Sequence, residues 1–513
     1  MVDCGLGAVE ASTDKRRMSV GHRNDGASGE ARAPHGPAHP RVLIIGAGMS
    51  GLLMGIRLLQ SGNTNFRIYE KASRIGGTWR ENTYPNLACD VFAVAYTYSF
   101  EPNPDWQYRF ARGDEIQTYF ERCERKYGLS PFIRFGSAVS EARWESGRWR
   151  LRTADGVEDE GDVLVSATGA LHHPRYPDIP GLRDFAGPCF HTARWDHTVD
   201  LRGKRVGVIG TGSTASQVVP GIVDKVARVH LFQRTPQWVL PTPDRKVSQA
   251  ARARRRRHPW LMHLQHWTGL FFMEVFSRAV LGNRILLRYI EQQCQANLAA
   301  IRDPELRRKL TPDYPPACKR LVVSEDFADA IQRDNAELVD APIARIEPAG
   351  VRTSDGRVVE LDVLVLATGF EPYKVDFELY GERGARLSER MAGSPLMYRT
   401  VGVPGMPNFF MLFGPYSPIG NMSIIENSEV QADYVMQCID LLRRGALRWM
   451  SPREDIARSL KDDMRHELGN TVWAGGCNSW YLDAEGQPIV YPFRYSRFRR
   501  ELAAPVLAEY ETG

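Results

Sequence analysis

The chain contains no pair of cysteines at the C-x-x-C spacing, although eight cysteines are scattered through its 513 residues. This scatter argues against a zinc ribbon, a dithiol redox site or a disulfide scaffold. We therefore expect no metal site and a reducing, cytoplasmic location. An uninterrupted apolar run of transmembrane length is also missing. Residues 260–290 come closest, but histidine, glutamate and arginine side chains interrupt them six times.

A strong charge of either sign is missing as well. The chain has 66 basic and 61 acidic residues, for a formal net charge of +5, whereas a nucleic-acid-binding protein would show a strongly basic domain or face. Residues 1–37 are poor in apolar side chains and lack a hydrophobic segment of the signal-peptide kind, which predicts a disordered leader. The remaining length exceeds one ordinary core, so two or more domains are expected.

A first dinucleotide-binding unit is predicted near residue 41. A short apolar run at residues 41–45 is typical of a buried parallel strand, and residues 52–60 have the pattern of a helix. A G-x-G-x-x-G motif lies between them, where glycines let the backbone approach a pyrophosphate at the helix N-terminus. Its expected cofactor-binding residues are Gly46, Gly48, Ser50 and Gly51. Glu70 follows the next strand, 24 residues after Gly46, and can accept hydrogen bonds from a ribose hydroxyl, which predicts FAD.

The pattern occurs a second time after a strand at residues 204–209, with alanine in place of the third glycine. The expected cofactor-binding residues here are Thr211, Gly212, Ser213, Thr214, Ala215 and Gln217. Arg234 lies 24 residues after the first glycine, with Thr235 beside it. An arginine at this position favours a 2′-phosphate, which predicts NADPH. The alternative is that Arg234 is a solvated loop residue.

Residues 162–169 and 362–369 are nearly identical, each an acidic start, a buried strand and an Ala-Thr-Gly turn. They resemble the strands that lead from one domain into the other in two-dinucleotide flavoproteins. The predicted fold is therefore α/β, with two Rossmann-like dinucleotide-binding domains and a helical insertion in the NADPH domain. The expected boundaries are 38–180 and 375–513 for the FAD domain, 185–370 for the NADPH domain, and about 246–313 for the insertion.

The insertion begins with a basic run at residues 252–257, followed by an aromatic-rich stretch at residues 260–276. Such a pairing could contact a membrane surface or an apolar substrate. The alternative is a helical subdomain with one solvated basic edge. No integral membrane segment is expected in either case.

Residues 185–196, between the two nucleotide motifs, read F-A-G-P-C-F-H-T-A-R-W-D. This segment fits the pattern F-x-G-x-x-x-H-x-x-x-W-[P/D] and resembles the fingerprint of type I Baeyer–Villiger monooxygenases, which insert oxygen beside a ketone. Its fixed positions are Phe185, Gly187, His191, Trp195 and Asp196. We expect His191 to couple domain positions rather than to contact substrate, although a purely structural histidine remains an alternative.

Two further segments carry the resemblance. Residues 84–90 end in Asp90, and residues 314–320 end in Lys319 and Arg320. The resemblance implies that Arg320 is the active-site arginine, that Asp90 holds it near the flavin, and that Lys319 contacts NADP. Other cofactor contacts that it implies are Gly77, Thr78, Trp79, Tyr96 and Val139. One departure is Asn-Leu-Ala at residues 86–88, where the family more often has Gly-Ala-Arg.

The resemblance implies an NADPH- and O2-dependent enzyme that converts a ketone to an ester or lactone through a C4a-peroxyflavin. A flavin monooxygenase that oxidises nitrogen or sulfur and a catalytically silent flavin-binding redox protein remain alternatives. Several aromatic residues hint at an apolar or cyclic ketone, namely Trp238, Trp260, Trp267, Phe271, Phe272, Tyr416 and Trp480.

Overall fold

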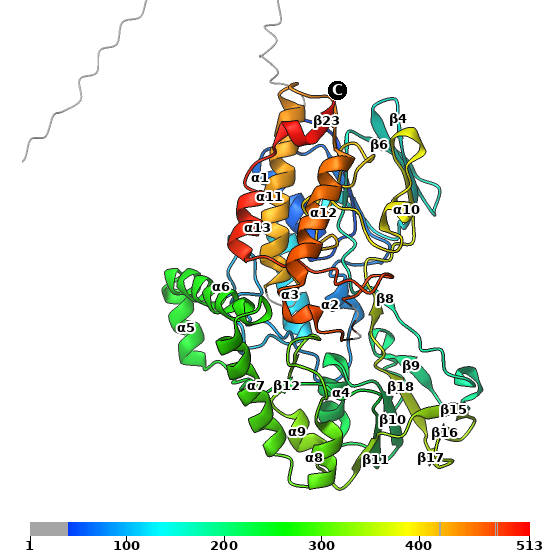
Figure 1. The fold of residues 1–513 in the computed structure, drawn as a ribbon. Helices are drawn as coiled ribbons and strands as arrows, with labels where there is room; N and C mark the ends of the chain where they lie inside the picture. Colours follow the sequence, from blue (N-terminus) through cyan, green and yellow to red (C-terminus); the bar gives the residue numbers. More distant parts are fainter. Residues whose placement is uncertain (1–38, 420–421, 478, 480) are drawn as a thin grey trace, which may run out of the picture. The chain divides into compact units, whose positions relative to one another are not determined.

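The computed structural model describes residues 39–419, 422–477, 479 and 481–513 (Figure 1). The predicted leader at residues 1–37 and Trp480 lie outside the described residues. No helix in the described ranges has the length and apolarity needed to cross a bilayer.

The first nucleotide unit is built on a five-stranded parallel sheet in the order β21-β7-β1-β2-β3. Its strands are β1 (Val42–Ile45), β2 (Phe66–Tyr69), β3 (Ile133–Arg134), β7 (Val163–Ser166) and β21 (Phe409–Met411). The sheet packs with the helices α1 (Met49–Gln60), α3 (Gly113–Tyr127) and α11 (Ile424–Arg443). The central strands are entirely buried, as expected for a parallel sheet covered by helices on its faces.

The second nucleotide unit repeats this plan, with a parallel sheet in the order β14-β11-β10-β18-β9. Its strands are β9 (Cys189–His191), β10 (Arg205–Ile209), β11 (Arg228–Phe232), β14 (Ala336–Val339) and β18 (Val363–Leu366). The helices α4 (Ser213–Ile222) and α9 (Phe327–Ala330) contact each other here. The fold class predicted from the doubled motif is therefore confirmed, whereas the exact domain boundaries stay a prediction.

A three-stranded antiparallel meander precedes the Ala-Thr-Gly strand of each unit. In the first, the sheet order is β20-β4-β5-β6, made of β4 (Val139–Glu145), β5 (Arg148–Thr153), β6 (Glu158–Gly161) and β20 (Glu378–Tyr380), which adds to the meander in parallel with β4. In the second, the order is β15-β16-β17, made of β15 (Ile343–Glu347), β16 (Gly350–Thr353) and β17 (Val358–Glu360). The two units thus share both their parallel sheet and the meander that leads into the Ala-Thr-Gly strand.

Four consecutive helices follow β12 (Val239–Leu240): α5 (Gln249–Arg257), α6 (Trp260–Val280), α7 (Arg284–Ala299) and α8 (Pro304–Leu310) (Figure 1). Their starts follow from the sequence, because Ser248, Asn283 and Asp303 cap α5, α7 and α8 with side-chain oxygens. The remaining elements used below are α2 (Thr78–Glu81), α10 (Leu387–Met391), α12 (Glu454–Leu468), α13 (Tyr495–Glu501), β8 (His173–Pro174), β13 (Val322–Val323) and β19 (Phe370–Glu371).

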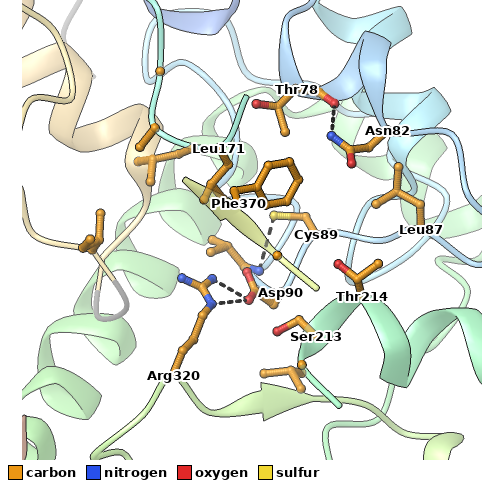
Figure 2. A pocket seen from close by; sticks show the side chains of 18 of the residues that line it. Thr78, Asn82, Leu87, Cys89, Asp90, Leu171, Ser213, Thr214, Arg320 and Phe370 are labelled. Carbon is orange, nitrogen blue, oxygen red and sulfur yellow. Dashed lines mark hydrogen bonds and ion pairs between the residues drawn. The ribbon is translucent and has the colours of Figure 1, made fainter. Parts of the chain in front are cut away.

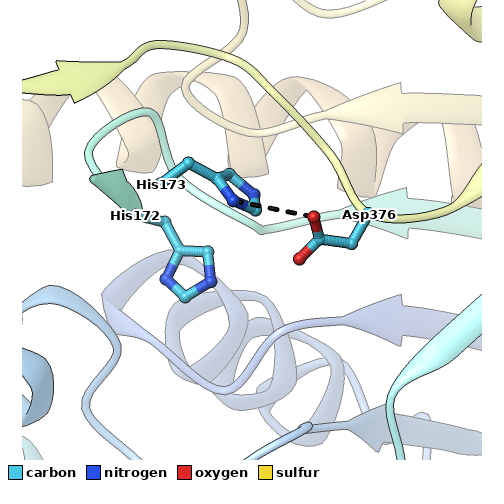
Figure 3. Close-up of side chains that lie close together, drawn as sticks. All are labelled: His172, His173 and Asp376. Carbon is cyan, nitrogen blue, oxygen red and sulfur yellow. Dashed lines mark ion pairs between the residues drawn. The ribbon is translucent and has the colours of Figure 1, made fainter. Parts of the chain in front are cut away.

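The two chain crossovers between the nucleotide units lie side by side. β8 pairs antiparallel with β19, and the Arg175 N–H donates to the Gly369 carbonyl at 2.9 Å. Next to this pair, His172, His173 and Asp376 come together, with 3.6 Å between His173 Nδ1 and Asp376 Oδ1 (Figure 3). Lys71 also contacts the Asp376 carboxylate, at 3.1 Å. Backbone pairing and side-chain contacts therefore tie the outgoing and returning segments to each other.

The structure differs from the cysteine prediction at one point, because Cys318 and Cys477 form a disulfide. The two residues are 159 positions apart, so their spacing in the sequence resembled no known paired motif. The bridge joins the segment that leads into Arg320 to the segment that leads into Tyr481. The other five cysteines of the described chain are free, and four of them are buried.

Candidate active site

A single continuous cavity of about 2260 Å³ lies at the carboxyl ends of both parallel sheets. Residues of the first glycine loop, the second glycine loop, the segment around Arg320 and the helices α6 and α7 all line it. A pocket for one drug-sized ligand has a volume of about 300–1,000 Å³. This cavity is therefore large enough for more than one ligand of that size.

The first glycine loop turns sharply after β1 because Gly46 has a φ of 103°. A Cβ there would lie 2.7 Å from the Ala167 carbonyl oxygen, so no other residue fits without a shift of the backbone. Helix α1 then begins after Gly48 without a side-chain cap and without an acidic residue in its first turn. Its first N–H groups are available to an anion, and Gly46, Gly48 and Ser50 line the cavity.

Glu70 is buried at the end of β2, beside this loop. The Ala47 N–H donates to Glu70 Oε2 at 2.8 Å, and the Ala72 N–H donates to Oε1 at 2.9 Å. The Arg80 guanidinium also contacts Oε1, at 3.1 Å. The carboxylate is thereby fixed at the wall of the cavity, where a ribose hydroxyl is expected.

The second loop repeats the geometry of the first. Gly210 has a φ of 116°, and a Cβ there would collide with the Ala367 carbonyl oxygen. Helix α4 begins after Gly212 without a side-chain cap. A Cβ at Gly212 would meet no atom within 4 Å, so the loop faces open space there. The cavity-lining residues of this loop are Thr211, Gly212, Ser213 and Thr214.

Two cations lie next to the second loop. Arg234 is exposed at the cavity wall, and no carboxylate in the described part of the chain forms an ion pair with it. Burial, and then the positive charge of Arg234, lower the pKa of Lys319. The ammonium of Lys319 also lies 4.3 Å from the centre of the Tyr314 ring. Thr235 belongs to the same wall, where its carbonyl accepts the Thr211 hydroxyl at 2.7 Å. An unpaired arginine beside a lysine is suited to a phosphate.

Arg320 and Asp90 form an ion pair in the interior of the cavity (Figure 2). Arg320 Nε donates to Asp90 Oδ2 at 3.0 Å, and the carboxylate raises the pKa of Arg320 above its ordinary value. About a third of the Arg320 side chain is accessible, and this part faces the cavity. Ser213 and Thr214 of the second loop lie on the other side of Asp90. The pair predicted from the family resemblance is thus brought together from segments 230 residues apart.

The residues expected near the flavin form one wall of the cavity. Gly77 precedes α2 with a φ of 53°, and its backbone lies against Gly48. Trp79 Nε1 donates to the Tyr96 hydroxyl at 3.0 Å, and the two rings meet edge to face. Thr78 and Val139 line the same cavity.

Gln217, on α4, lines the cavity and also forms hydrogen bonds to the segment that precedes Asp90. Its amide nitrogen donates to the Ala88 carbonyl at 3.0 Å, and its oxygen accepts from the Tyr84 hydroxyl at 3.1 Å. Helix α4 of the second unit therefore holds the segment that carries Asp90. Sequence reasoning placed Gln217 in the nucleotide loop but could not identify this partner, because Asn-Leu-Ala at residues 86–88 contributes through its backbone.

Two residues expected to bind cofactor do not line the cavity. A Cβ at Gly51 would collide with the Gly46 carbonyl, and Ala215 is fully buried in the core of the second unit. Both positions need a small residue so that the helix can approach its strand. In this structure the two residues shape the loops and lie away from the cavity surface.

The fingerprint lies outside the cavity, at the crossover between the units. His191 ends β9, where its ring is 5.6 Å from the Tyr176 ring and 5.9 Å from the Phe370 ring, one on each crossover segment. Burial lowers the pKa of His191 to about 4, so the imidazole is neutral at neutral pH. The other positions pack or cap locally: Phe185 is buried against Gly187, Trp195 meets Phe190 edge to face, and Asp196 accepts from Thr198.

The aromatic residues expected to surround the substrate are mostly elsewhere. Among the described ones, only Phe272 lines the cavity. Trp238 and Tyr416 are buried in the core, whereas Trp260, Trp267 and Phe271 are exposed on α6. The sequence pattern could not separate these cases, because all three environments accept an aromatic ring. Tyr481 was not among the predicted site residues, although it lies close to Arg320. Burial raises the pKa of its hydroxyl, and the positive charge of Arg320 acts in the opposite direction.

Comparisons with known proteins agree with this geometry. The family model of flavin-binding monooxygenase-like proteins matches residues 39–462. An uncharacterized monooxygenase of Mycobacterium tuberculosis is 46% identical over 474 residues, covering 92% of this chain and 96% of that protein. A Baeyer–Villiger monooxygenase of Streptomyces coelicolor is 40% identical over 484 residues, covering 92% of each chain.

Solved structures are similar over the same range. The OTEMO complex with FAD and NADP has a TM-score of 0.84 at 25% identity, covering 93% of this chain and 100% of that one. Cyclohexanone monooxygenase from Rhodococcus sp. Phi1 bound to NADP+ has a TM-score of 0.82 at 26% identity, covering 93% and 99%. The family resemblance read from the sequence is confirmed. This chain belongs to the flavin-binding monooxygenase-like family and, within it, to the flavin-dependent Baeyer–Villiger monooxygenases.

Proposed function

We propose that this enzyme uses NADPH and O2 to convert an apolar ketone to an ester or lactone, with Arg320 and Asp90 as its central catalytic residues. The observation that carries the proposal is the Arg320–Asp90 ion pair, which faces a cavity shared by both glycine loops. Bound FAD supplies the oxygen-transfer chemistry, with NADPH as the source of the reducing equivalents.

The two loops fit the two dinucleotides. Both helices α1 and α4 start at a glycine without a side-chain cap, which leaves N–H groups for a pyrophosphate. The carboxylate of Glu70 suits the free ribose hydroxyls of FAD, whereas Arg234 and Lys319 suit the 2′-phosphate of NADPH. The assignment of FAD to the first loop and NADPH to the second rests on this difference in charge.

Arg320 has the properties that the oxygen insertion requires. Insertion beside a carbonyl builds negative charge on the reacting oxygens, and a fixed cation in a water-poor site stabilises that charge. Arginine remains protonated there, and Asp90 raises its pKa further. Asp90 also orients the guanidinium through the bond to Nε. The part of Arg320 that remains accessible faces the cavity beside Tyr481, where the carbonyl oxygen of the ketone would bind.

An apolar substrate is supported by the neighbours of this pair. The buried cluster beside Arg320 contains Ala317, Phe413, Ile419 and Trp473, and all four line the cavity. The disulfide of Cys318 fixes this wall next to the arginine. Such a wall stabilises apolar groups of a ketone and excludes water from the reacting carbonyl.

Replacement of Arg320 by alanine tests the proposal. NADPH should still reduce the bound flavin in anaerobic stopped-flow measurements, because the loops are intact, while ester formation should fall by about 100-fold or more. Arg202→Ala, at an exposed arginine paired with Asp200, is the matched control and should behave as the wild type. Unchanged ester formation by Arg320→Ala would remove the arginine from the mechanism. A wild-type enzyme that oxidises thioethers or amines but no ketone would favour the heteroatom-oxygenating alternative.

A further inference from the structure

The outer face of the helical insertion carries most of the exposed apolar side chains of the described chain. Trp260, Leu264, Trp267 and Phe271 follow one another on α6 at spacings of four, three and four residues, which places them on one side of the helix. Each has more than half of its surface exposed. The opposite side of α6, which includes Met262 and Gly269, is buried. Helix α6 is therefore apolar on both sides, whereas a surface helix of a soluble protein normally has a polar outer side.

The neighbouring helix α7 extends this surface. Ile285 and Tyr289 are exposed there, and α7 contacts α6 directly. Together, these two helices hold seven of the thirteen large hydrophobic side chains that are exposed in the described residues. An apolar surface of this kind marks a site of interaction with another molecule or with a membrane.

Positive charge is concentrated on the same helices. Residues 249–299 contain eight arginines and two acidic residues, whereas the whole chain has a net charge of only +5. Five of these arginines are exposed and have no ion-pair partner among the described carboxylates: Arg254, Arg257, Arg278, Arg284 and Arg288. Helices α5 and α6 follow each other along one side of the protein (Figure 1). This segment therefore accounts for the whole net positive charge of the chain.

The cavity opens toward this surface. Leu264 and Phe272 on α6 and Tyr289 on α7 are exposed, and each also lines the cavity. The apolar face therefore borders an entrance to the active site. A ligand that enters there passes directly from the outer face of α6 to the interior.

We propose that the outer face of α5, α6 and α7 docks onto an anionic lipid surface. The aromatic stripe of α6 enters the boundary between headgroups and acyl chains, and the unpaired arginines contact the anionic headgroups. Apolar substrate then enters the cavity from the bilayer without crossing bulk water. This last step rests on the proposed function, whereas the docking itself does not.

A second copy of the chain fits this surface less well. A twofold interface places the same surface of each copy against the other, so the arginine-rich segments would face each other. Like charges brought together at an interface oppose association. An anionic bilayer instead complements both the charge and the apolar stripe.

Vesicle co-sedimentation of the FAD-loaded full chain tests the proposal. Binding to vesicles with about one third phosphatidylglycerol should exceed binding to pure phosphatidylcholine by about tenfold or more, and high salt should weaken it. The double variant Trp267→Ser/Phe271→Ser should lose most of this binding. Arg254→Gln/Arg257→Gln should lose the preference for the anionic lipid. Flavin absorbance and thermal unfolding of each variant show whether it is folded.

The matched control is Val506→Ser/Leu507→Ser, which removes two exposed apolar side chains near the C-terminus and should bind like the wild type. Absence of wild-type binding to anionic vesicles, or full binding by the Trp267/Phe271 variant, would overturn the proposal. So would a wild-type dimer that Phe271→Ser converts to a monomer, because the face would then be an interface between copies. Arg320→Ala should bind vesicles normally, which separates this test from the test of catalysis.

Discussion

Arg234 and Lys319 show how two side chains can determine the choice of a cofactor. Neither residue has a carboxylate partner within ion-pairing distance in the described structure, and the charge of Arg234 contributes to the lowered pKa of Lys319. Two cations held close together repel each other, and a bound anion between them removes this repulsion. A 2′-phosphate would satisfy both, whereas the free hydroxyl of NADH would satisfy neither.

Arg234→Ala is therefore expected to raise the KM for NADPH by about 10- to 100-fold, because a charge-assisted hydrogen bond contributes about 1.5–3 kcal/mol. The KM for NADH should change little. Steady-state rates with both cofactors measure this ratio. The same ratio in Arg202→Ala should equal that of the wild type. An unchanged preference for NADPH over NADH in Arg234→Ala would contradict the phosphate assignment.

The glycines of the two loops and the charged residues that follow them were predictable from the sequence. Each is required by a strand, turn or cofactor contact formed by residues close to it in the chain. Gly46 and Gly210 are required by a turn that each strand forms with its own loop, and Glu70 and Arg234 follow at equal spacing. The contact of Gln217 with Ala88 was not predictable, because it joins two side-by-side segments through a backbone group that any residue could supply.

Among the elements, the segments joined by Cys318 and Cys477 connect the arginine to the C-terminal wall of the cavity. One segment lies between α8 and β13, and the other lies between α12 and α13. Neither segment has a long helix or strand of its own to hold it. The disulfide therefore holds these two segments in place.

Reduction of this bridge should lower the melting temperature by about 5 °C or more, because a loop of this length stabilises by about 5 kcal/mol in the chain-entropy model. The KM for the ketone should rise, because the wall beside Arg320 becomes looser. The double variant Cys318→Ser/Cys477→Ser should resemble the reduced wild type and should not respond to reductant. Differential scanning fluorimetry with and without reductant measures this effect. Equal melting of the wild type in both conditions would show that the bridge contributes nothing.

The strands were predictable from their apolar runs, and so was the repeated Ala-Thr-Gly turn. The disulfide was not, because its cysteines are 159 positions apart in the sequence and only the tertiary fold brings them together. The distribution of aromatic rings on α6 was also hidden, since a helix with apolar residues on all sides looks the same in sequence whether its outer side is buried or exposed.

For the molecule as a whole, a buried acid contributes to how stability depends on pH. Glu429 on α11 is almost fully buried, and its Oε1 accepts from the Ser99 N–H at 2.9 Å. Burial, with a further contribution from Glu426, raises its pKa from 4.5 to about 7, while Arg57 acts in the opposite direction. The folded state therefore binds this proton more tightly than the unfolded state. Its stabilising effect is complete below about pH 4.5 and is lost as the pH rises through 7.

Glu429→Gln keeps an acceptor oxygen without the charge, so the variant should match the wild type at pH 5. At pH 8 it should be more stable by up to about 3 kcal/mol, which is the free energy of the pKa shift. Urea unfolding at the two pH values measures this difference. Glu389→Gln, at an exposed glutamate on α10, should show no such pH dependence. If the free energy of unfolding of the variant differed from that of the wild type by the same amount at both pH values, the pKa of Glu429 would not be raised into this range.

The paired crossovers have a consequence for how such proteins can be built. β8 and β19 are hydrogen-bonded neighbours, although nearly two hundred residues separate them in the chain. A domain whose entry and exit lie at one point adds little loop-closure cost to its host. The second nucleotide unit could thus be removed or exchanged as a whole, while the parallel sheet of the first unit kept every strand and its register. Recombination at the paired β8 and β19 strands would allow one FAD domain to be combined with nucleotide domains that bind different reductants.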